Sequence, residues 1–147
     1  MVTIDKRQTA DGTLHVTIAG KIDERFDGAT VTGSARGKVI IHLGAVRSIS
    51  SLGVRAFEHF VHSLPADVVL VHVSPAIAQQ IVMIPNLVGN HTHVESAKLP
   101  FVCPACGSEK AHSVPFRVGS AAENAPACAS CGATMELDGL PEQYLPV

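Results

Sequence analysis

The sequence predicts an α/β protein in which helices pack on a mixed sheet, followed by a small cysteine-rich domain. Short runs of aliphatic and β-branched residues, typical of buried strands, alternate with segments whose apolar residues recur at helical spacing. In addition, none of the four cysteines of the 147-residue chain lies before position 103. We therefore expect an α/β domain at residues 1–98 and a ribbon-like domain with an acidic tail at residues 99–147.

Composition excludes several classes of protein. With 46% hydrophobic and 16% charged residues, the chain has enough apolar material for a core, which excludes general disorder. A formal net charge of −2 gives no overall attraction to nucleic acid or to an anionic membrane. The apolar runs are far shorter than the roughly 20 residues of a membrane span, and the first residues lack the apolar block of a signal peptide. These features predict a soluble, cytoplasmic protein.

The first elements are predicted from alternation and turn residues. Residues 2–8 and 13–19 alternate between apolar and polar side chains, and Asp11-Gly12 between them favours a turn, so we expect a β-hairpin. Residues 25–37 are rich in Gly, Thr, Ser and Arg and have weak periodicity. They predict a loop with at most a short helix.

A buried strand and a capped helix come next. Residues 38–43 form a nearly continuous apolar, β-branched run, which predicts a central parallel strand. Ser50 and Ser51 offer hydroxyls that can cap a helix N-terminus, and Pro65 ends the helix. The apolar residues that define its inner face are Leu52, Ala56, Phe57, Phe60, Val61 and Leu64.

The same pair of elements is then repeated. Residues 67–73 predict a second buried strand, and Ser74-Pro75 supplies a cap and a proline at the first position of a helix that runs to about residue 84. Residues 91–95 predict an edge strand. The expected order is strand, strand, short helix, strand, helix, strand, helix, strand.

The cysteines form two CxxC pairs separated by 21 residues: Cys103, Cys106, Cys128 and Cys131. In the absence of an export signal, this spacing predicts a metal site and not disulfides. Four thiolates complete a tetrahedron around Zn²⁺ and leave no open position, so the zinc is expected to be structural. Residues 99–147 are poor in large apolar side chains, and metal binding would supply part of their stability. A redox pair and incidental free thiols remain as alternatives.

The charge of this C-terminal segment indicates what it can contact. From residue 99 onward, two basic residues stand against five acidic ones, a net charge of −3. Ribbons that bind nucleic acid usually carry basic strands, so a protein contact or a purely stabilising role is favoured. We also expect that the ribbon is either a second docking element or a cover for the exposed edge of the strand at residues 91–95.

Three segments in the expected order carry a family resemblance. IAGKID at residues 18–23 is followed by IIHLGAVRSISSLGVRAFEHF and then by VVLVHVSPAIAQQI. Together they resemble the STAS domain, the fold of bacterial anti-sigma factor antagonists, over roughly residues 2–97. The resemblance implies a small, non-enzymatic regulatory domain that docks to a serine kinase, anti-sigma factor, sensor or transporter.

The resemblance also implies a modification site. Partner-switching members carry Asp-Ser-Ser-Gly before a Leu-Gly-Val segment, and a kinase that is also an anti-sigma factor phosphorylates the serine before the glycine. Here Ser48-Ile49-Ser50-Ser51 precedes Leu52-Gly53-Val54, so three of the four motif positions differ. Ser50 occupies the acceptor position and Ser51 is the next candidate. The alternative is that both serines only cap the helix.

A docking surface around this turn is the functional hypothesis. It comprises Ser50, Ser51, Gly53, Arg55, Glu58, His59 and His62. Binding that is constitutive or depends on conformation is preferred, and phosphorylation is the alternative. No catalytic residues are assigned, since the sequence has neither a nucleophile elbow nor a glycine-rich phosphate loop.

Histidines support two other interpretations. His59 with His62, or His91 with His93, could bind a metal in an enzyme, although neither pair has a third ligand at a suitable spacing. His42 and His72 lie near the ends of two strands expected to be adjacent, where they could face each other and shift each other's pKa. The alternative functions are thus a metal-dependent enzyme that uses histidines and a zinc-ribbon protein associated with nucleic acid or polymerase.

Overall fold

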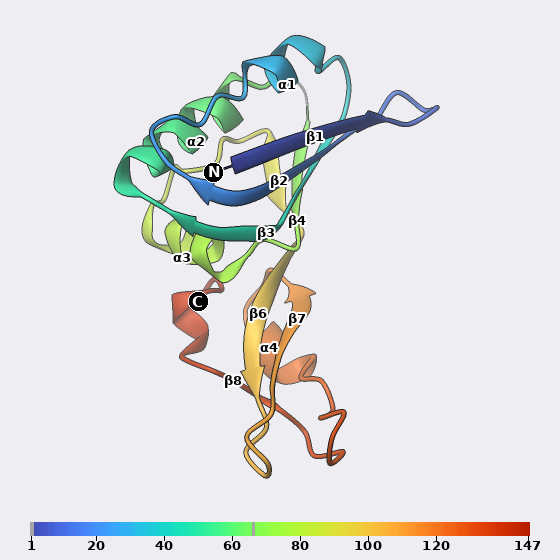
Figure 1. Cartoon of the computed structure of the whole chain (residues 1–147), viewed down its shortest axis with the longest axis vertical. Helices are drawn as coiled ribbons and strands as arrows, with labels where there is room; N and C mark the ends of the chain where they lie inside the picture. The colour runs from blue at the N-terminus through green and yellow to red at the C-terminus, as the bar shows by residue number, and fades with distance from the viewer. Residues whose placement is uncertain (1, 66) are drawn as a thin grey trace.

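A computed structural model describes residues 2–65 and 67–147 (Figure 1). The elements are β1 (Val2–Gln8), β2 (Leu14–Ile22), α1 (Ala29–Ser34), β3 (Val39–Ile49), α2 (Ser51–Ser63), β4 (Val68–Val71), α3 (Pro75–Met83), β5 (Thr92–Val94), β6 (Ser96–Val102), β7 (Glu109–Pro115), α4 (Ser120–Glu123), β8 (Glu136–Leu137) and η1 (Pro141–Gln143). The predicted α/β class and the order of its first eight elements are confirmed.

The main sheet has the order β1-β2-β3-β4-β5. β1 and β2 form the predicted antiparallel hairpin, and all the other neighbours are parallel, so β3 is central and β5 is an edge strand, as expected. β2 and β3 continue beyond residues 19 and 43, where the apolar patterns end. Register shifts between Thr17 and Ala19 and between Gly20 and Lys21 allow the two strands to stay paired through this stretch.

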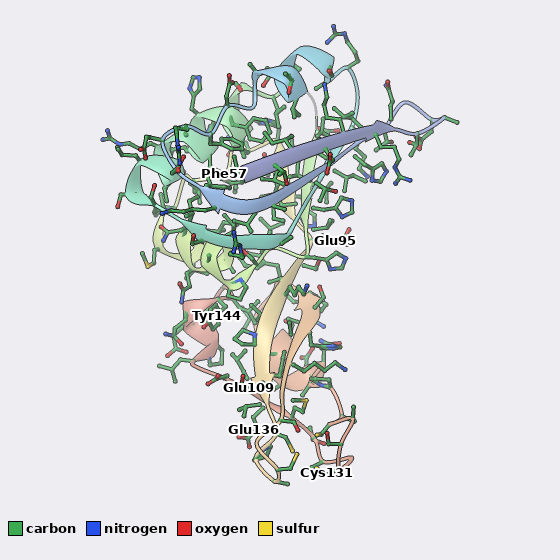
Figure 2. All side chains as sticks on the ribbon, in the orientation of Figure 1. Phe57, Glu95, Glu109, Cys131, Glu136 and Tyr144 are labelled. Carbon is green, nitrogen blue, oxygen red and sulfur yellow. The ribbon has the colours of Figure 1, made fainter. Side chains whose placement is uncertain are left out.

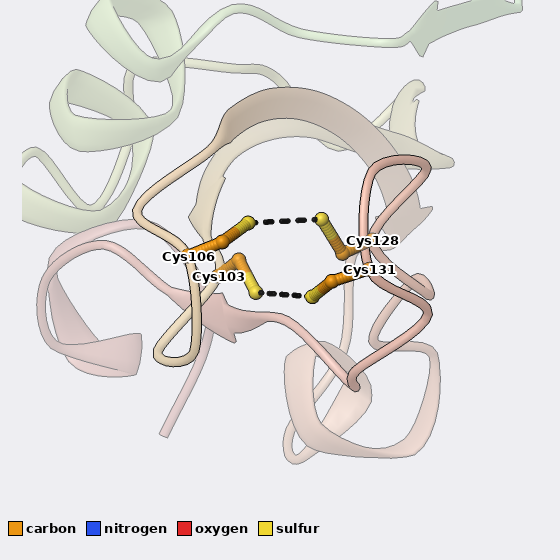
Figure 3. A group of neighbouring side chains, drawn as sticks. All are labelled: Cys103, Cys106, Cys128 and Cys131. Atoms are coloured by element: carbon orange, nitrogen blue, oxygen red, sulfur yellow. Dashed lines mark hydrogen bonds between the residues drawn. The ribbon is translucent and has the colours of Figure 1, made fainter.

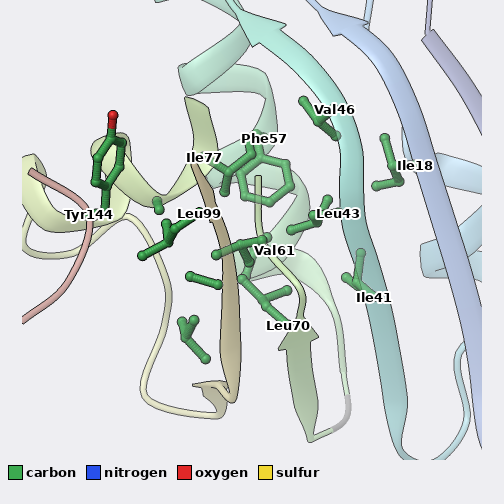
Figure 4. Packing of buried hydrophobic residues seen from close by; sticks show 14 of the residues in the cluster. Ile18, Ile41, Leu43, Val46, Phe57, Val61, Leu70, Ile77, Leu99 and Tyr144 are labelled. Carbon is green, nitrogen blue, oxygen red and sulfur yellow. The ribbon is translucent and has the colours of Figure 1, made fainter. Parts of the chain in front are cut away.

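One face of this sheet forms the core. In β2 and β3 the residues of one face are buried, and Phe57 and Val61 of α2 and Ile77 of α3 pack against them (Figure 4). The other face carries His15 and His42, which are half-buried, and Thr17, which is exposed. The main sheet is therefore covered by its long helices on one side only, and this leaves polar side chains accessible on the other.

The segment before β3 is a loop with a short helix, as predicted. It is anchored by Phe26, whose ring makes an edge-to-face contact with Phe60 at a centroid distance of 5.4 Å, and by the fully buried Val31. A Cβ at Gly28 would lie 2.2 Å from the ring of Phe60. Glycine is thus required there for the segment to lie against α2.

The second sheet, β7-β6-β8, begins without a linker. Val73 and Ala97 form a parallel bridge, and the N–H of Lys98 donates to the carbonyl of Val73 at 2.7 Å. The boundary expected between residues 98 and 99 lies inside β6, whose residues Leu99 and Phe101 belong to the same buried cluster as the main core. β6 and β7 extend away from the main sheet, so they do not lie along the edge strand β5 (Figure 1).

The end of the chain returns to the first domain, a contact that no local sequence pattern indicates. η1 lies against α3, and the residues that follow it, Tyr144 and Leu145, are 8% and 1% exposed (Figure 2). The acidic tail is therefore part of the packed structure.

Leu145→Ala is expected to lower the free energy of unfolding by about 2–5 kcal/mol, because it leaves a cavity in the buried cluster to which Leu145 belongs. Leu140→Ala is the matched control in the same tail, since Leu140 is 59% exposed and its change should cost less than about 0.5 kcal/mol. Chemical denaturation of both variants measures the difference. Equal effects would contradict the docking of the tail.

Candidate functional site: the serine turn and the cysteine cluster

The serine turn is held by the ends of two neighbouring strands. Ile22 pairs with Ile49, and the next N–H, that of Ser50, donates to the carbonyl of Ile22 at 3.0 Å. The hydroxyl of Ser50 then accepts the N–H of Gly53 at 3.0 Å, so Ser50 is the N-cap of α2. Ser51 is the exposed first residue of the helix. The predicted capping role is therefore confirmed for Ser50.

Gly53 determines how closely α2 approaches β2. It is buried, and a Cβ at this position would lie 2.3 Å from the carbonyl oxygen of Ile22 and 3.0 Å from the Cα of Asp23. Real Cβ atoms do not approach other atoms so closely, so a larger residue would push the helix away from the strand. Within the hypothesised docking surface, Gly53 thus positions the helix and is not itself accessible to a partner.

The carboxylate of Asp23 follows the end of β2, beside the serine turn. Asp23 accepts the N–H of Arg25 at 2.9 Å and its guanidinium at 2.8 Å. These bonds, together with the charge of Arg25, lower the pKa of Asp23 from its usual 3.8 to about 2. Because the folded-state pKa is the lower one, the contribution to stability is present above pH 4 and is lost as the pH falls from about 4 towards 2.

The exposed face of α2 carries most of the remaining residues of the hypothesised surface. Ser51, Arg55, His59 and His62 are exposed, while Glu58 is half-buried. His59 borders a hollow of about 390 Å³ between α1 and α2, and Nε2 of His62 lies 2.9 Å from the carbonyl oxygen of Asn86.

Leu52 is more exposed than its helical spacing predicts. Helical spacing assigned it to the inner face, but it is 54% exposed at the first turn of α2. The exposed Arg47, near the end of β3, adds a positive charge at the same end of the sheet, whereas the charge of Arg25 is offset by Asp23. Sequence patterning could not identify this apolar and basic surface, because it depends on which strand ends meet.

The four cysteines meet at the far end of the second sheet (Figure 3). Their sulfurs all lie within 4.8 Å of one another, with 3.5 Å between Cys103 and Cys131 and 3.6 Å between Cys106 and Cys128. A metal bound tetrahedrally by thiolates at about 2.3 Å requires sulfurs about 3.8 Å apart. The predicted ligands are therefore together, in an arrangement that suits a metal ion.

Two loops with the same backbone pattern position these sulfurs. The N–H of Gly107 donates to the carbonyl of Cys103 at 2.9 Å, and that of Gly132 donates to the carbonyl of Cys128 at 2.8 Å. Both glycines have a positive φ, of 78° and 80°. Each CxxCG segment thus makes a turn that residues other than glycine rarely adopt, and the repeat explains why both pairs are followed by glycine.

The ionisation of these thiols also favours a cation. The N–H groups of Cys131 and Ser130 lower the pKa of Cys128 to about 6. The N–H of Ala133 acts on Cys131 in the same direction, but the neighbouring thiols and burial outweigh it and raise the pKa of Cys131 to about 11. Four thiolates this close repel one another, and a bound metal ion removes that penalty.

The histidine pairs obtain no third ligand. Across residues 2–65 and 67–147, the cysteines are the one group of three or more potential ligands that comes together. His42 contacts His15, with Nδ1 of His15 3.4 Å from Nε2 of His42. As expected, the charge of His72 also lowers the pKa of His42, although burial and His15 contribute more. Nδ1 of His72 instead lies 2.6 Å from Oγ of Ser113.

Gly53→Ala should destabilise the fold by about 1–3 kcal/mol, because the added methyl must separate α2 from β2. Gly33→Ala is the control, since a Cβ at Gly33 meets nothing within 4 Å. That change should be neutral or slightly stabilising. Thermal unfolding of the two variants tests the close approach, which equal stabilities would refute.

The serine turn lies within the part of the chain that matches a known protein family. The model of the STAS domain family matches residues 8–93, and the cysteine cluster lies outside this match. No curated protein matches the chain significantly. None of the helices within residues 2–65 and 67–147 has the length and apolarity needed to span a bilayer. The match covers more than half of the sequence, so the chain belongs to the STAS domain family.

Proposed function

We propose that this chain is a non-enzymatic, cytoplasmic regulatory protein of the anti-sigma factor antagonist type, which acts by protein–protein contact in a bacterial signalling pathway. The observation that carries the proposal is the STAS match. The turn through which the family is expected to dock is present, and Ser50 caps the helix that follows it. STAS domains are generally regulatory modules that act through protein interactions. The STAS part would comprise residues 1–98, and the ribbon residues 99–147.

The docking surface is the exposed face of α2 and the turn before it. Arg55 and His59 are exposed there, next to the exposed side chain of Leu52. An apolar side chain next to an exposed arginine favours a partner that offers an apolar contact and an acidic rim beside it. A serine kinase that is also an anti-sigma factor, or a sensor protein, is the class of partner that the family implies.

Binding without phosphorylation is the preferred mechanism. The hydroxyl of Ser50 already serves as the helix cap and is half-buried, while that of Ser51 is exposed. A phosphate on either serine would lie favourably at the helix N-terminus, so phosphorylation remains the alternative. High phosphate occupancy at Ser50 or Ser51 in protein from its native cells, measured by phosphopeptide mapping, would make phosphorylation the preferred mechanism.

The metal of the cysteine cluster is proposed to be zinc in a structural role. Zn²⁺ prefers tetrahedral thiolate coordination, and four protein ligands leave no position for water or substrate. Cys103 and Cys128 are buried, whereas Cys106 and Cys131 are exposed. When bound, the ion supplies no chemistry beyond joining the two CxxC loops.

Cys131→Ser should abolish stoichiometric zinc binding and disorder the two loops, because three thiolates and a hydroxyl hold zinc poorly. Cys103→Ser and Cys128→Ser should do the same, but they also change buried positions. Ser130→Ala, in the same loop, is the control and should keep one zinc per chain. Metal analysis under reducing conditions, together with hydrogen exchange of residues 2–94, checks that the STAS part remains folded. Absence of metal from the wild-type protein would refute the proposal.

Arg55→Glu should weaken partner binding at least tenfold, because it places a negative charge opposite the proposed acidic rim. Arg36→Glu is the matched control. Arg36 is exposed just before β3, whereas the proposed docking surface follows the other end of this strand. The measurement is affinity capture of the intact protein from its native cells with nuclease present. Partners are identified by mass spectrometry, and their affinity is then measured.

Recovery of a serine kinase, an anti-sigma factor or a sensor that Arg55→Glu loses and Arg36→Glu keeps would support the proposal. Recovery of polymerase or ribosomal components alone would instead favour the nucleic-acid-associated ribbon.

A further inference from the structure

A cavity of about 400 Å³ lies where the open face of the main sheet meets the second sheet. Thr17, His42 and Gly44 line it from β2 and β3, and Lys98 and Ser113 line it from β6 and β7, with His72 between the sheets. The volume is within the range of small-molecule sites. Lys98 and Ser113 lie beyond residues 8–93, so the segment that matches the STAS family does not form this cavity by itself.

The polar groups around the cavity can all donate hydrogen bonds. Its lining contains one ammonium, two imidazoles and two hydroxyls, and no carboxylate. Within the described residues, Lys98 forms no ion pair. One ring nitrogen of each imidazole is engaged, by His15 for His42 and by Ser113 for His72. The other ring nitrogens have no hydrogen bond to the described part of the chain, which leaves them available to a ligand.

Backbone features show that the space is built into the fold. The register shift between Thr17 and Ala19 brings Gly44 to the cavity wall, and a Cβ there would lie 3.2 Å from the carbonyl oxygen of His72 and 3.4 Å from Cδ of Lys98. His72 has a φ of 51°, the one positive φ among the described residues that are not glycine. Bulges and left-handed residues concentrate at functional sites.

A metal ion does not suit this lining. The nearby histidines do not form a group of three possible ligands, and the ammonium of Lys98 would repel a cation. A phosphate group offers several terminal oxygens to the many donors here, whereas a carboxylate offers two. We propose that the junction cavity binds a small phosphate-bearing molecule, with Lys98 as the principal charged contact, Thr17 and Ser113 as hydroxyl donors, and His42 and His72 as donors when their imidazoles are protonated.

The proposal predicts a dependence on pH. Burial and the charges of His15, His72 and Arg7 lower the pKa of His42, while Glu95 acts in the opposite direction. A bound phosphate adds negative charge beside the imidazoles and Lys98, so it should raise the pKa of His42. By linkage, proton uptake by His42 favours binding at the lower pH, whereas protonation of the phosphate monoester itself, whose second pKa is about 6, opposes it, so the decisive readout is the pKa of His42.

Calorimetric titration of the full-length, metal-loaded protein with glycerol phosphate, at constant ionic strength, tests the proposal. Lys98→Gln should lower the affinity about tenfold or more, because a charge-assisted hydrogen bond is lost. Lys110→Gln is the control, an exposed lysine on β7 outside the cavity, and should remain within about twofold of wild type. NMR titration of the histidines measures whether the ligand raises the pKa of His42.

Binding that is lost in Lys98→Gln, retained in Lys110→Gln and accompanied by a higher His42 pKa would support the site. Absence of binding by the wild-type protein would overturn it, as would equal affinity in Lys98→Gln. Tighter binding of succinate than of glycerol phosphate would refute the assignment to phosphate. These outcomes are independent of partner docking at Arg55, so this inference and the proposed function can fail separately.

Discussion

The placement of the C-terminal third depends on one short stretch of parallel pairing. Val73 bridges Ala97, and the N–H of Lys98 donates to the carbonyl of Val73. Because β6 then continues without interruption into the second sheet, the direction of this contact also sets the direction of β7 and of the cysteine loops. The same contact brings Lys98 to His72 and Gly44, so the junction cavity is a consequence of the way in which the two sheets are joined.

Burial is unevenly distributed along this extension. Leu99 and Phe101 of β6 belong to the main core, but Cys106, Gly107, Cys131 and Gly132, at the far end, are exposed. Loops with so little apolar contact cannot by themselves offset the entropy lost on ordering them, and a bound metal would compensate for that loss. Tyr144 and Leu145 stabilise the opposite end by packing close to α3. The ribbon thus has core packing near the main sheet and, at its tip, four thiols in an arrangement that suits a metal ion.

Local patterns predicted those features whose causes are local. The two buried strands, the caps Ser50 and Ser74 and the cysteine cluster follow from short-range chemistry, and all are present. The full length of β3, the packing of Leu145, the exposure of Leu52 and the contact between His15 and His42 depend on which distant segments meet. For β3, Gly44 and Ala45 interrupt the apolar run, so its continuation depends on pairing with β2 and cannot be seen in residues 38–49 alone.

The close contact at Gly53 also limits what a modification of the turn could do. The helix cannot approach β2 more closely, and Ser50 is fixed at both its N–H and its hydroxyl. A phosphate on Ser50 or Ser51 would therefore change the charge of the surface next to Arg25 and Arg55 more than it would change the position of α2. Regulation at this turn, whether by modification or by competing partners, would then act through electrostatic complementarity at the docking surface, with the fold below it unchanged.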